Sequence, residues 1–407
     1  MICRHCQKPL NHNFIDLGFQ PPSNAYLCKS DLSKPEMTYP LRVMVCDQCW
    51  LVQTDDYTTA GEVFTKDYAY FSSTSKGWVS HAKSYCETVI SRFNLDASSK
   101  VIEVASNDGY LLKNFITAKI PCLGIEPTES TANAAEKLGI TTIKKFFGTD
   151  LAHCLTSEGS SADLIIGNNV FAHVPDINDF AKGLEITLKP EGVITLEFPH
   201  LMKLVELAQF DTIYHEHFSY LSLLAVTKVF EKSGLRIFDI DELSTHGGSI
   251  RIYACKIEAN HAESNAVQAM IDMEKALGMD KISFYQDIQS RAEKIKNSLI
   301  KFLIQIKDDG KSVSAYGAAA KGNTILNFAG IKPDLLPVVY DAAKAKQNKF
   351  MPGSHIPILD PKELINNRPD YILILPWNIA TEVKKDLSYL AAKGTKFVTA
   401  VPKLEIF

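Results

Sequence analysis

The sequence of 407 residues lacks the features that would place it at a membrane or on a nucleic acid. It has no apolar run long enough to span a bilayer, and its first residues carry no apolar signal core. Positive charge is not in excess, because 43 lysines and arginines stand against 47 aspartates and glutamates and give a formal net charge of -4. We therefore expect no nucleic-acid or membrane partner, and a cytoplasmic protein that acts on a small molecule as a monomer or weak homo-oligomer.

We also expect no disulfide bonds, because the nine cysteines of a cytoplasmic chain stay mostly reduced. Cys3 and Cys6 form one Cys-x-x-Cys pair, and Cys46 and Cys49 form another. Four thiolates close a tetrahedral shell around Zn²⁺ and leave no open position for catalysis. The sequence therefore predicts a structural zinc site in an N-terminal module over residues 1–66. Buried free thiols that share this spacing by chance are the alternative.

Glycine is scarce at the turn where a cofactor is expected. Residues 103–109 end a predicted strand and open a helix, and they contain a single glycine. A pyrophosphate loop needs three glycines so that backbone amides reach the phosphates. An acidic turn with one glycine instead suits a ligand that has a cationic centre and no phosphate, which is S-adenosylmethionine (SAM). The predicted cofactor residues are Glu103, Ser106, Asn107, Asp108, Gly109, Leu111, Glu126, Pro127, Asn168 and Asn169.

Three of these residues carry specific expectations. Glu126 ends the next predicted strand and is spaced to accept hydrogen bonds from ribose hydroxyls, a role that fits NAD equally well. Asn168 and Asn169 end a later strand, at the edge where open α/β sheets bind their ligands. An asparagine pair that only turns the chain is the alternative for these two residues.

Short apolar strands alternate with helices over two stretches of the chain. The first stretch predicts a doubly wound parallel sheet, and residues 235–240 and 249–253 follow it with no helix between them. We predict that these two segments pair antiparallel and end the sheet, as in class I methyltransferases. The stretch 261–306 is largely amphipathic helix, and a second alternating unit follows it. The predicted domains are the zinc-binding module at 1–66, a SAM-binding methyltransferase domain at 67–260 whose part 67–99 is an aromatic loop and lead-in helix, and C-terminal helices with a second Rossmann-like domain at 261–407.

The segment 214–220 crowds two imidazoles, a carboxylate and two phenols into seven residues. An ordinary core segment would not hold so many of these groups, because each of them needs its own partner when it is buried. Titratable groups of this kind instead cluster where protons are moved. Tyr214 and His217 would face opposite sides of a strand, so they cooperate only if the segment is a loop or a helical turn. A metal site at His215 and His217 is an alternative, although the helical His-Glu-x-x-His spacing is missing.

A set of motifs in a fixed order resembles one known family, the SAM-dependent sugar C-methyltransferases that act on nucleotide-linked deoxyhexoses. The similarity runs over nearly the whole chain. It implies a zinc-binding module, a central SAM-binding domain and a C-terminal Rossmann-like domain that helps to hold the sugar nucleotide. The substrate it implies is a dTDP- or other NDP-4-keto-deoxyhexose that is methylated at C3. The motifs are the two Cys-x-x-Cys pairs and residues 68–73, 103–109, 169–176, 214–217, 246–249, 316–324, 352–358 and 376–378.

The resemblance also implies roles for individual residues. His217 is the general base, while His173, Tyr214, Glu216 and a tyrosine of the aromatic loop, Tyr68 or Tyr70, surround the sugar. The chemistry agrees, because a carbon next to a ketone must lose a proton before it attacks the sulfonium methyl group, and a neutral histidine accepts a proton near neutral pH. Tyr214, or His215 if it faces the substrate, would donate a hydrogen bond to the oxyanion. Further predicted substrate contacts are Tyr70, His215, His246, Ser249, Arg251, Lys321 and Asn323.

The loop at residues 317–324 resembles a phosphate loop, but Asn323 replaces the lysine that a Walker motif requires. We predict that Lys321 and the backbone amides of this loop contact a diphosphate, or else that the loop is a tight turn between strand and helix. Three other functions compete with C-methylation. They are O- or N-methylation of a sugar nucleotide, a non-catalytic zinc-bearing binding module, and an NAD-dependent epimerase, which the single-glycine turn disfavours.

Overall fold

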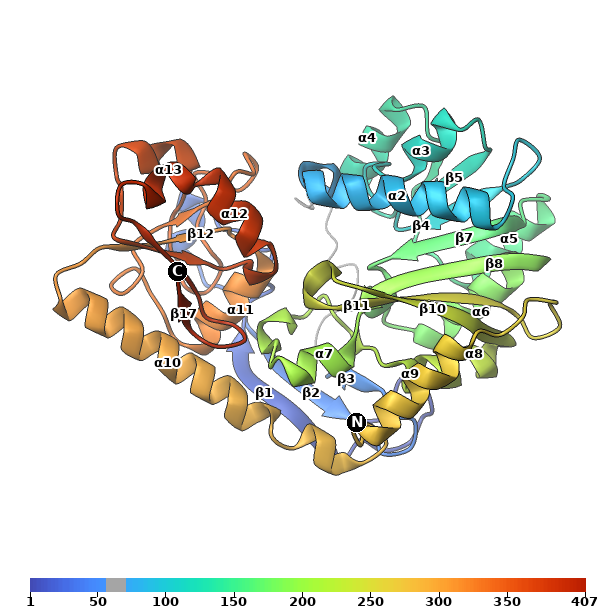
Figure 1. Cartoon of the computed structure of the whole chain (residues 1–407), viewed down its shortest axis with the longest axis horizontal. Helices are drawn as coiled ribbons and strands as arrows, with labels where there is room; N and C mark the ends of the chain where they lie inside the picture. The colour runs from blue at the N-terminus through green and yellow to red at the C-terminus, as the bar shows by residue number, and fades with distance from the viewer. Residues whose placement is uncertain (56–70) are drawn as a thin grey trace.

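The computed structural model describes residues 1–55 and 71–407 (Figure 1). Tyr68 and Tyr70, and the predicted boundary at residues 66 and 67, lie outside these ranges. The described residues form three sheets, which are built mainly from the N-terminal, central and C-terminal parts of the chain. No helix in the described ranges combines the length and the apolar character that crossing a bilayer requires.

The N-terminal sheet receives one strand from a distant part of the chain. Its order is β1-β2-β3-β9, and neighbouring strands are antiparallel. Three strands come from the first 55 residues, but β9 is the end of the segment 214–220 that we predicted to carry the chemistry. That segment is therefore anchored on the N-terminal sheet. The strands are β1 (His12–Gln20), β2 (Tyr39–Val45), β3 (Val52–Thr54) and β9 (Ser219–Tyr220).

The central sheet has the order β10-β11-β8-β7-β4-β5-β6, and its inner strands are parallel. β10 pairs antiparallel with β11, and β11 pairs antiparallel with β8, so the predicted ending is confirmed. The bounds are β4 (Val101–Val104), β5 (Cys122–Ile125), β6 (Thr142–Ile143), β7 (Ala162–Asn168), β8 (Leu188–Pro199), β10 (Leu235–Leu243) and β11 (Ser249–Lys256).

Both faces of this sheet are buried, which explains the continuous apolar runs in its strands. Val101 and Leu164 face one core with helices α2 and α3, whereas Ile102 and Ile165 face the other core with helices α5, α6 and α8. The alternation of adjacent residues between two cores makes the sheet doubly wound, as predicted. The helices of this part are α2 (Lys76–Arg92), α3 (Leu112–Thr117), α4 (Glu129–Lys137), α5 (Thr149–Ser157), α6 (Ile177–Thr187), α7 (Leu201–Glu206) and α8 (Leu223–Ser233).

The C-terminal part holds the predicted second alternating sheet, with the order β14-β13-β12-β15-β16-β17. The stretch 261–306 forms two helices, and α10 buries Ile288, Ala292 and Ile295 at the predicted spacing. Figure 1 shows α10 running beside β1 towards the C-terminal sheet. The bounds are α9 (Asn265–Ala276), α10 (Ile288–Asp308), α11 (Ala320–Phe328), α12 (Ala380–Asp386), α13 (Ser388–Ala391), β12 (Val313–Tyr316), β13 (Val339–Tyr340), β14 (Ile358–Leu359), β15 (Tyr371–Ile374), β16 (Lys396–Thr399) and β17 (Glu405–Ile406).

Candidate active site

The four cysteines of the two Cys-x-x-Cys pairs meet in the N-terminal module, as predicted. Their sulfur atoms all lie within 4.8 Å of one another. The Cys3 and Cys49 sulfurs are 3.5 Å apart, and the Cys6 and Cys46 sulfurs are also 3.5 Å apart. The Gln53 amide donates to the Cys3 sulfur over 3.2 Å, which is the support that a ligated thiolate receives from its surroundings. This set of four sulfurs fits a tetrahedral structural Zn²⁺.

The carboxyl ends of β4, β5 and β7 form a second polar site, which we call the cofactor edge. Several buried polar atoms at this edge have no hydrogen-bond partner among the described residues. Because buried polar groups are nearly always paired, the edge is built for a polar ligand. The unpaired atoms are Glu103 Oε2, Ser106 Oγ, Asp108 Oδ1, both amide atoms of Asn168, and Asn169 Oδ1.

The charge of the cofactor edge selects the kind of ligand. Burial raises the pKa of Glu103 well above its usual value, and the nearby Glu126 and Asp108 raise it further. Burial also raises the pKa of Glu126, although the Thr128 and Asn107 amides that it accepts partly offset this rise. A cation bound here would relieve the repulsion among the carboxylates. The edge therefore fits SAM, which carries a sulfonium and an ammonium group.

The turn at the cofactor edge is held in a left-handed conformation. Asn107 has a φ of 49°, and its backbone amide donates to Glu126 over 3.0 Å. The Asn107 side chain in turn accepts the Ser72 amide over 2.9 Å, which docks the start of α2 on the turn. Pro127 lies half-buried beside Glu126. Leu111 is a correction, because its apolar side chain is fully buried in the core below the turn and does not face a ligand.

Replacing Gly109 by alanine should destabilise the protein more than the same change at Gly139. Both glycines have positive φ, but a Cβ at Gly109 would lie 2.4 Å from Ile140 Cδ1, whereas a Cβ at Gly139 meets nothing within 4 Å. The difference should be about 1–3 kcal/mol, the usual cost of overpacking, and denaturant unfolding would measure it. Equal losses at the two positions would show that the turn has room to relax.

The segment 214–217 is a turn, so the condition for Tyr214 and His217 to cooperate is met. The His217 amide donates to the Tyr214 carbonyl over 2.9 Å, and the two ring centroids are 4.1 Å apart. The His173 ring lies 4.6 Å from His217 and the Tyr220 ring 6.0 Å from it. Tyr214, His217 and His173 are partly exposed, so a substrate can reach them. The structure thus brings these predicted residues together.

The hydrogen bond of His217 fixes which of its nitrogens is basic. Nδ1 lies 2.9 Å from the Thr212 carbonyl, and a carbonyl can only accept, so Nδ1 carries the proton and Nε2 keeps its lone pair. The surrounding protein removes water from the His217 ring and lowers its pKa well below its usual value, and the neighbouring His173 lowers it further. Burial also lowers the pKa of His173 to about 4, partly offset by a hydrogen bond to the Glu216 backbone. Both imidazoles are therefore neutral at physiological pH.

Glu216 joins this turn to the N-terminal module. Its carboxylate is buried and accepts a hydrogen bond from the Asn24 amide over 2.5 Å. That Glu216 also surrounds the sugar, as the resemblance implies, stays a prediction. No local pattern marks Asn24, because its partner lies 192 residues further along the chain.

Four residues predicted to bind substrate have partners within the chain instead. The His215 ring faces the N-terminal sheet, 3.2 Å from the Pro40 carbonyl, because neighbouring residues of the turn point to different sides. The Ser249 hydroxyl donates to the Thr245 carbonyl over 2.9 Å. The remaining two are Arg251, which is paired with Glu197 at 2.6 Å, and Asn323, which donates to the Ser23 carbonyl over 2.6 Å.

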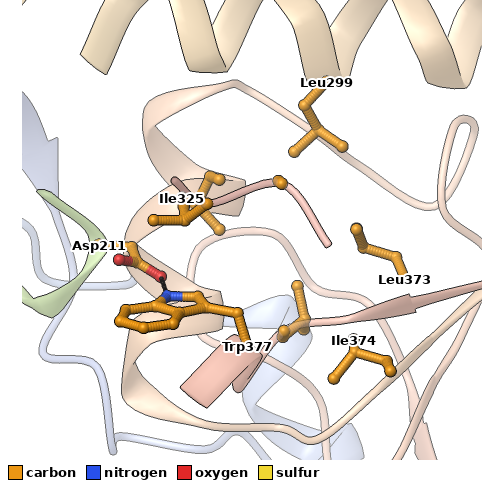
Figure 2. Close-up of a pocket in the computed structure, with 9 residues that line it drawn as sticks. Asp211, Leu299, Ile325, Leu373, Ile374 and Trp377 are labelled. Carbon is orange, nitrogen blue, oxygen red and sulfur yellow. Dashed lines mark hydrogen bonds between the residues drawn. The ribbon is translucent and has the colours of Figure 1, made fainter. Parts of the chain in front are cut away.

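The C-terminal part contributes Lys321, at the start of α11. Its ammonium lies 3.0 Å from the Asn378 amide oxygen and 4.5 Å from the centre of the Trp377 ring. Packing removes water and lowers the pKa of Lys321 to about 8, although the charge of Asp211 opposes this shift. Figure 2 shows the Trp377 indole turned towards Asp211, at the side of a small pocket that Leu299 and Ile325 also line. The indole nitrogen donates to Asp211 over 2.7 Å. This contact forms the junction between the C-terminal part and the segment that precedes the turn at 214–217.

His246 lies between the cofactor edge and this junction. Its Nε2 is 2.9 Å from the Asn169 amide nitrogen, and its φ of 52° is unusual for a residue other than glycine. Packing lowers the pKa of His246 to about 4, and the charge of Lys321 adds to this shift. A Cβ at the next residue, Gly247, would lie 2.4 Å from the Trp377 ring. The predicted residues His246 and Asn169 are therefore in contact with each other.

Family models match three successive parts of the chain. Residues 3–64 match a zinc binding domain, residues 78–240 a methyltransferase domain, and residues 244–402 a C-methyltransferase C-terminal domain. The first match contains the four cysteines, and the second contains the cofactor edge.

One relative is similar over almost the entire chain. The C-methyltransferase NovU of Streptomyces niveus is 31% identical over 401 residues, which cover 98% of this chain and 95% of NovU. Among solved structures, the magnesium protoporphyrin IX methyltransferase of Synechocystis PCC 6803 with bound SAM covers 44% of this chain and 80% of its own, with 16% identity and a TM-score of 0.34. The glycopeptide N-methyltransferase MtfA covers 43% of this chain and 96% of its own, with 13% identity and a TM-score of 0.35.

Proposed function

Because the chain belongs to the SAM-dependent C-methyltransferases, a family with an N-terminal zinc-binding domain, we propose that it methylates C3 of a nucleotide-linked 4-keto-deoxyhexose. The observation that carries this proposal is the state of His217. Its imidazole is neutral, its Nδ1 is tied to the Thr212 carbonyl, and its Nε2 is left to accept a proton. Carbon methylation next to a ketone needs such a base, whereas methylation of an oxygen or nitrogen does not require removal of a C–H proton.

The proposed reaction begins when His217 Nε2 removes the proton from C3 of the sugar. The electrons of the C–H bond form an enolate with the 4-keto group, and the Tyr214 phenol beside the base donates a hydrogen bond to its oxygen. When bound, SAM would supply the electrophilic methyl group, whose bond to sulfur breaks as the bond to C3 forms, so that S-adenosylhomocysteine is the leaving group. His217 then returns its proton to water.

The cofactor edge would hold SAM through charge and unpaired hydrogen-bonding atoms. Glu103 and Asp108 lie where the cationic part is attracted, and Asn168 offers both a donor and an acceptor. Glu126, whose two oxygens each accept one backbone amide, is the residue that we propose for the ribose hydroxyls.

Lys321 is the residue that we propose for the diphosphate of the substrate. Its charge lowers the pKa of both His217 and His246, so it lies within electrostatic range of the base. The ammonium group of Lys321, at the start of α11, suits the binding of an anionic diphosphate oxygen.

The pH profile tests the two ionisations together. Protonated His217 cannot accept a proton, so kcat/KM should fall as pH drops, but only well below pH 6.5 because the pKa of His217 is lowered. Deprotonated Lys321 cannot hold the diphosphate, so kcat/KM should also fall as pH rises through about 8. In Lys321→Arg the charge persists and the alkaline limb should disappear. An unchanged alkaline limb in that variant would remove Lys321 from the substrate site.

The direct test of the proposed function is incubation with SAM, a panel of keto-sugar nucleotides and deuterated water, read by mass spectrometry. We expect one product that carries an added methyl group and uptake of solvent deuterium at C3 of the unmethylated substrate. A methylated product without such exchange would favour O- or N-methylation. Calorimetry that detects no SAM binding by the zinc-loaded protein would favour a non-catalytic binding module.

A further inference from the structure

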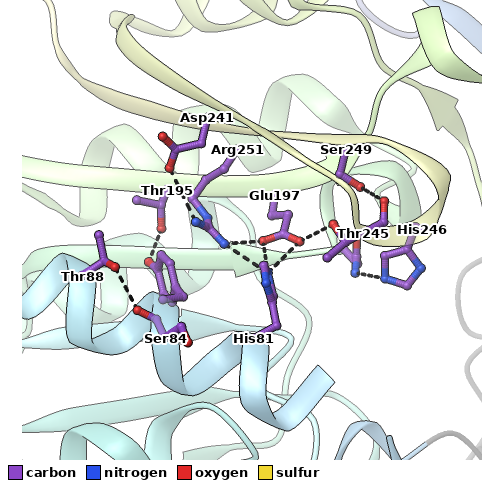
Figure 3. Close-up of polar contacts among 12 residues, drawn as sticks. His81, Ser84, Thr88, Thr195, Glu197, Asp241, Thr245, His246, Ser249 and Arg251 are labelled. Atoms are coloured by element: carbon purple, nitrogen blue, oxygen red, sulfur yellow. Dashed lines mark hydrogen bonds and ion pairs between the residues drawn. The ribbon is translucent and has the colours of Figure 1, made fainter. Parts of the chain in front are cut away.

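Glu197, near the end of β8, is a fully buried carboxylate that the proposed reaction does not use. Arg251 donates to it over 2.6 Å, and the Thr245 hydroxyl donates to it over 2.9 Å. The Nε2 of His81 lies 2.8 Å and 3.0 Å from its two oxygens (Figure 3). Burial alone would raise the pKa of Glu197, but the His81 hydrogen bond and the charge of Arg251 outweigh burial and lower it. Glu197 is therefore an ionised acceptor that ties three segments together.

These contacts close a ring of side chains. His81 stacks on Trp78, one turn earlier in α2, with ring centroids 5.0 Å apart. Trp78 meets the His246 ring edge to face at 5.1 Å. His246 follows Thr245, whose hydroxyl returns to Glu197. Residues 78 and 246 therefore form one wall, which we call the Trp78–His246 wall. Glu197 contacts both sides of this wall, through His81 next to Trp78 and through Thr245 next to His246.

The Trp78–His246 wall stands between the two halves of the proposed active site. On one side, His246 contacts Asn169, whose own backbone amide donates to the Glu197 carbonyl over 2.7 Å. On the other side, Gly247 packs against Trp377, which lies beside Lys321. The cofactor edge and the proposed diphosphate site therefore lie on either side of this wall.

The base is held by different contacts. His217 is fixed by the Thr212 carbonyl, and its own carbonyl accepts the Thr54 hydroxyl over 3.2 Å. None of the hydrogen bonds recorded for His217 among the described residues involves Glu197, His81 or Thr245. The hydrogen bonds that hold the base are therefore separate from those that hold the wall.

We propose that Glu197 is a positioning residue for methyl transfer, which holds the Trp78–His246 wall through His81 and Thr245 so that the enolate carbon is aligned with the methyl group. The inference rests on the proposed function. Methyl transfer needs reacting atoms at about 3–3.5 Å in line, and a shift of about 1 Å can cost 100-fold in rate. Loosening the wall should therefore slow methyl transfer and spare proton exchange.

Thr245→Val tests this inference, because it removes one hydroxyl and keeps the shape of the side chain. The ratio of methylated product to C3 deuterium exchange should fall by about 10-fold or more, with unchanged SAM affinity and zinc content. Thr245→Ser should recover most of this ratio. The matched control is Thr88→Val, which removes an exposed hydroxyl from α2 that donates to the Ser84 carbonyl.

Nitrogen-15 spectra of the histidine rings give a readout that needs no substrate. The His246 signals should change in Thr245→Val and stay at their wild-type positions in Thr88→Val. Identical His246 spectra in all variants, or equal losses of exchange and methylation in Thr245→Val, would overturn the inference. If the wild-type protein methylated no keto sugar, the proposed function would fail, whereas the spectra would still decide whether Glu197 positions this wall.

Discussion

Replacing His217 by glutamine is expected to abolish deuterium exchange at C3 and methyl transfer together. Glutamine keeps an N–H group that can reach the Thr212 carbonyl, but it has no basic nitrogen at neutral pH. The loss should be about 100- to 10,000-fold, the usual contribution of a positioned general base. SAM affinity should stay unchanged, since the base lies in the turn after η4 (Phe210–Thr212) and the cofactor edge lies on the central sheet.

His215→Gln is the matched control for this prediction. It changes the same residue type two positions earlier in the same turn, but the His215 ring contacts the Pro40 carbonyl and the Tyr39 ring. Exchange should therefore persist in this variant. Exchange that survives in His217→Gln, or is lost equally in both variants, would show that the base is elsewhere. His173 would then be the next candidate, because its ring lies 4.6 Å from His217.

The parts of the fold that follow from local pattern were predictable. The two Cys-x-x-Cys pairs identified all four ligands, because thiolate spacing is a local property. The absence of a helix between residues 240 and 249 was enough to predict the antiparallel pair β10 and β11. Contacts between distant segments left no such local sign. The strand β9, two residues long, joins the N-terminal sheet through its pairing with β3, the one pairing of β9 among the described strands.

The candidate site was predictable as a set of residue types, but not as a set of contacts. Asn323 and Arg251 have the chemistry of substrate-binding residues, yet each already has a partner inside the chain. The sequence analysis missed Glu197, although a carboxylate among the apolar residues of β8 is unusual and is a signal that could have identified it. The partner that a polar side chain finds depends on three-dimensional packing, which a single sequence does not specify.

Removing zinc is expected to impair the base as well as the N-terminal module. The Gln53 amide donates to the Cys3 sulfur, and the next residue, Thr54, holds the base. The Thr54 hydroxyl donates to the His217 carbonyl over 3.2 Å, and the Thr54 amide donates to the Phe218 carbonyl over 3.1 Å. A structural zinc contributes on the order of 10 kcal/mol to folding of a small module, so its loss should release these contacts.

Cys46→Ala should therefore bind no zinc, unfold at a lower temperature and lose deuterium exchange at C3 by at least about 100-fold, since a base displaced by about 1 Å costs that much. SAM affinity should change little, because the cofactor edge belongs to the central sheet. The control is Cys154→Ala, at an exposed cysteine outside the cluster. Thr54→Val should retain zinc and lose part of the exchange, which separates the metal from the contact it supports. Full exchange in zinc-free Cys46→Ala would mean that the central domain alone positions His217.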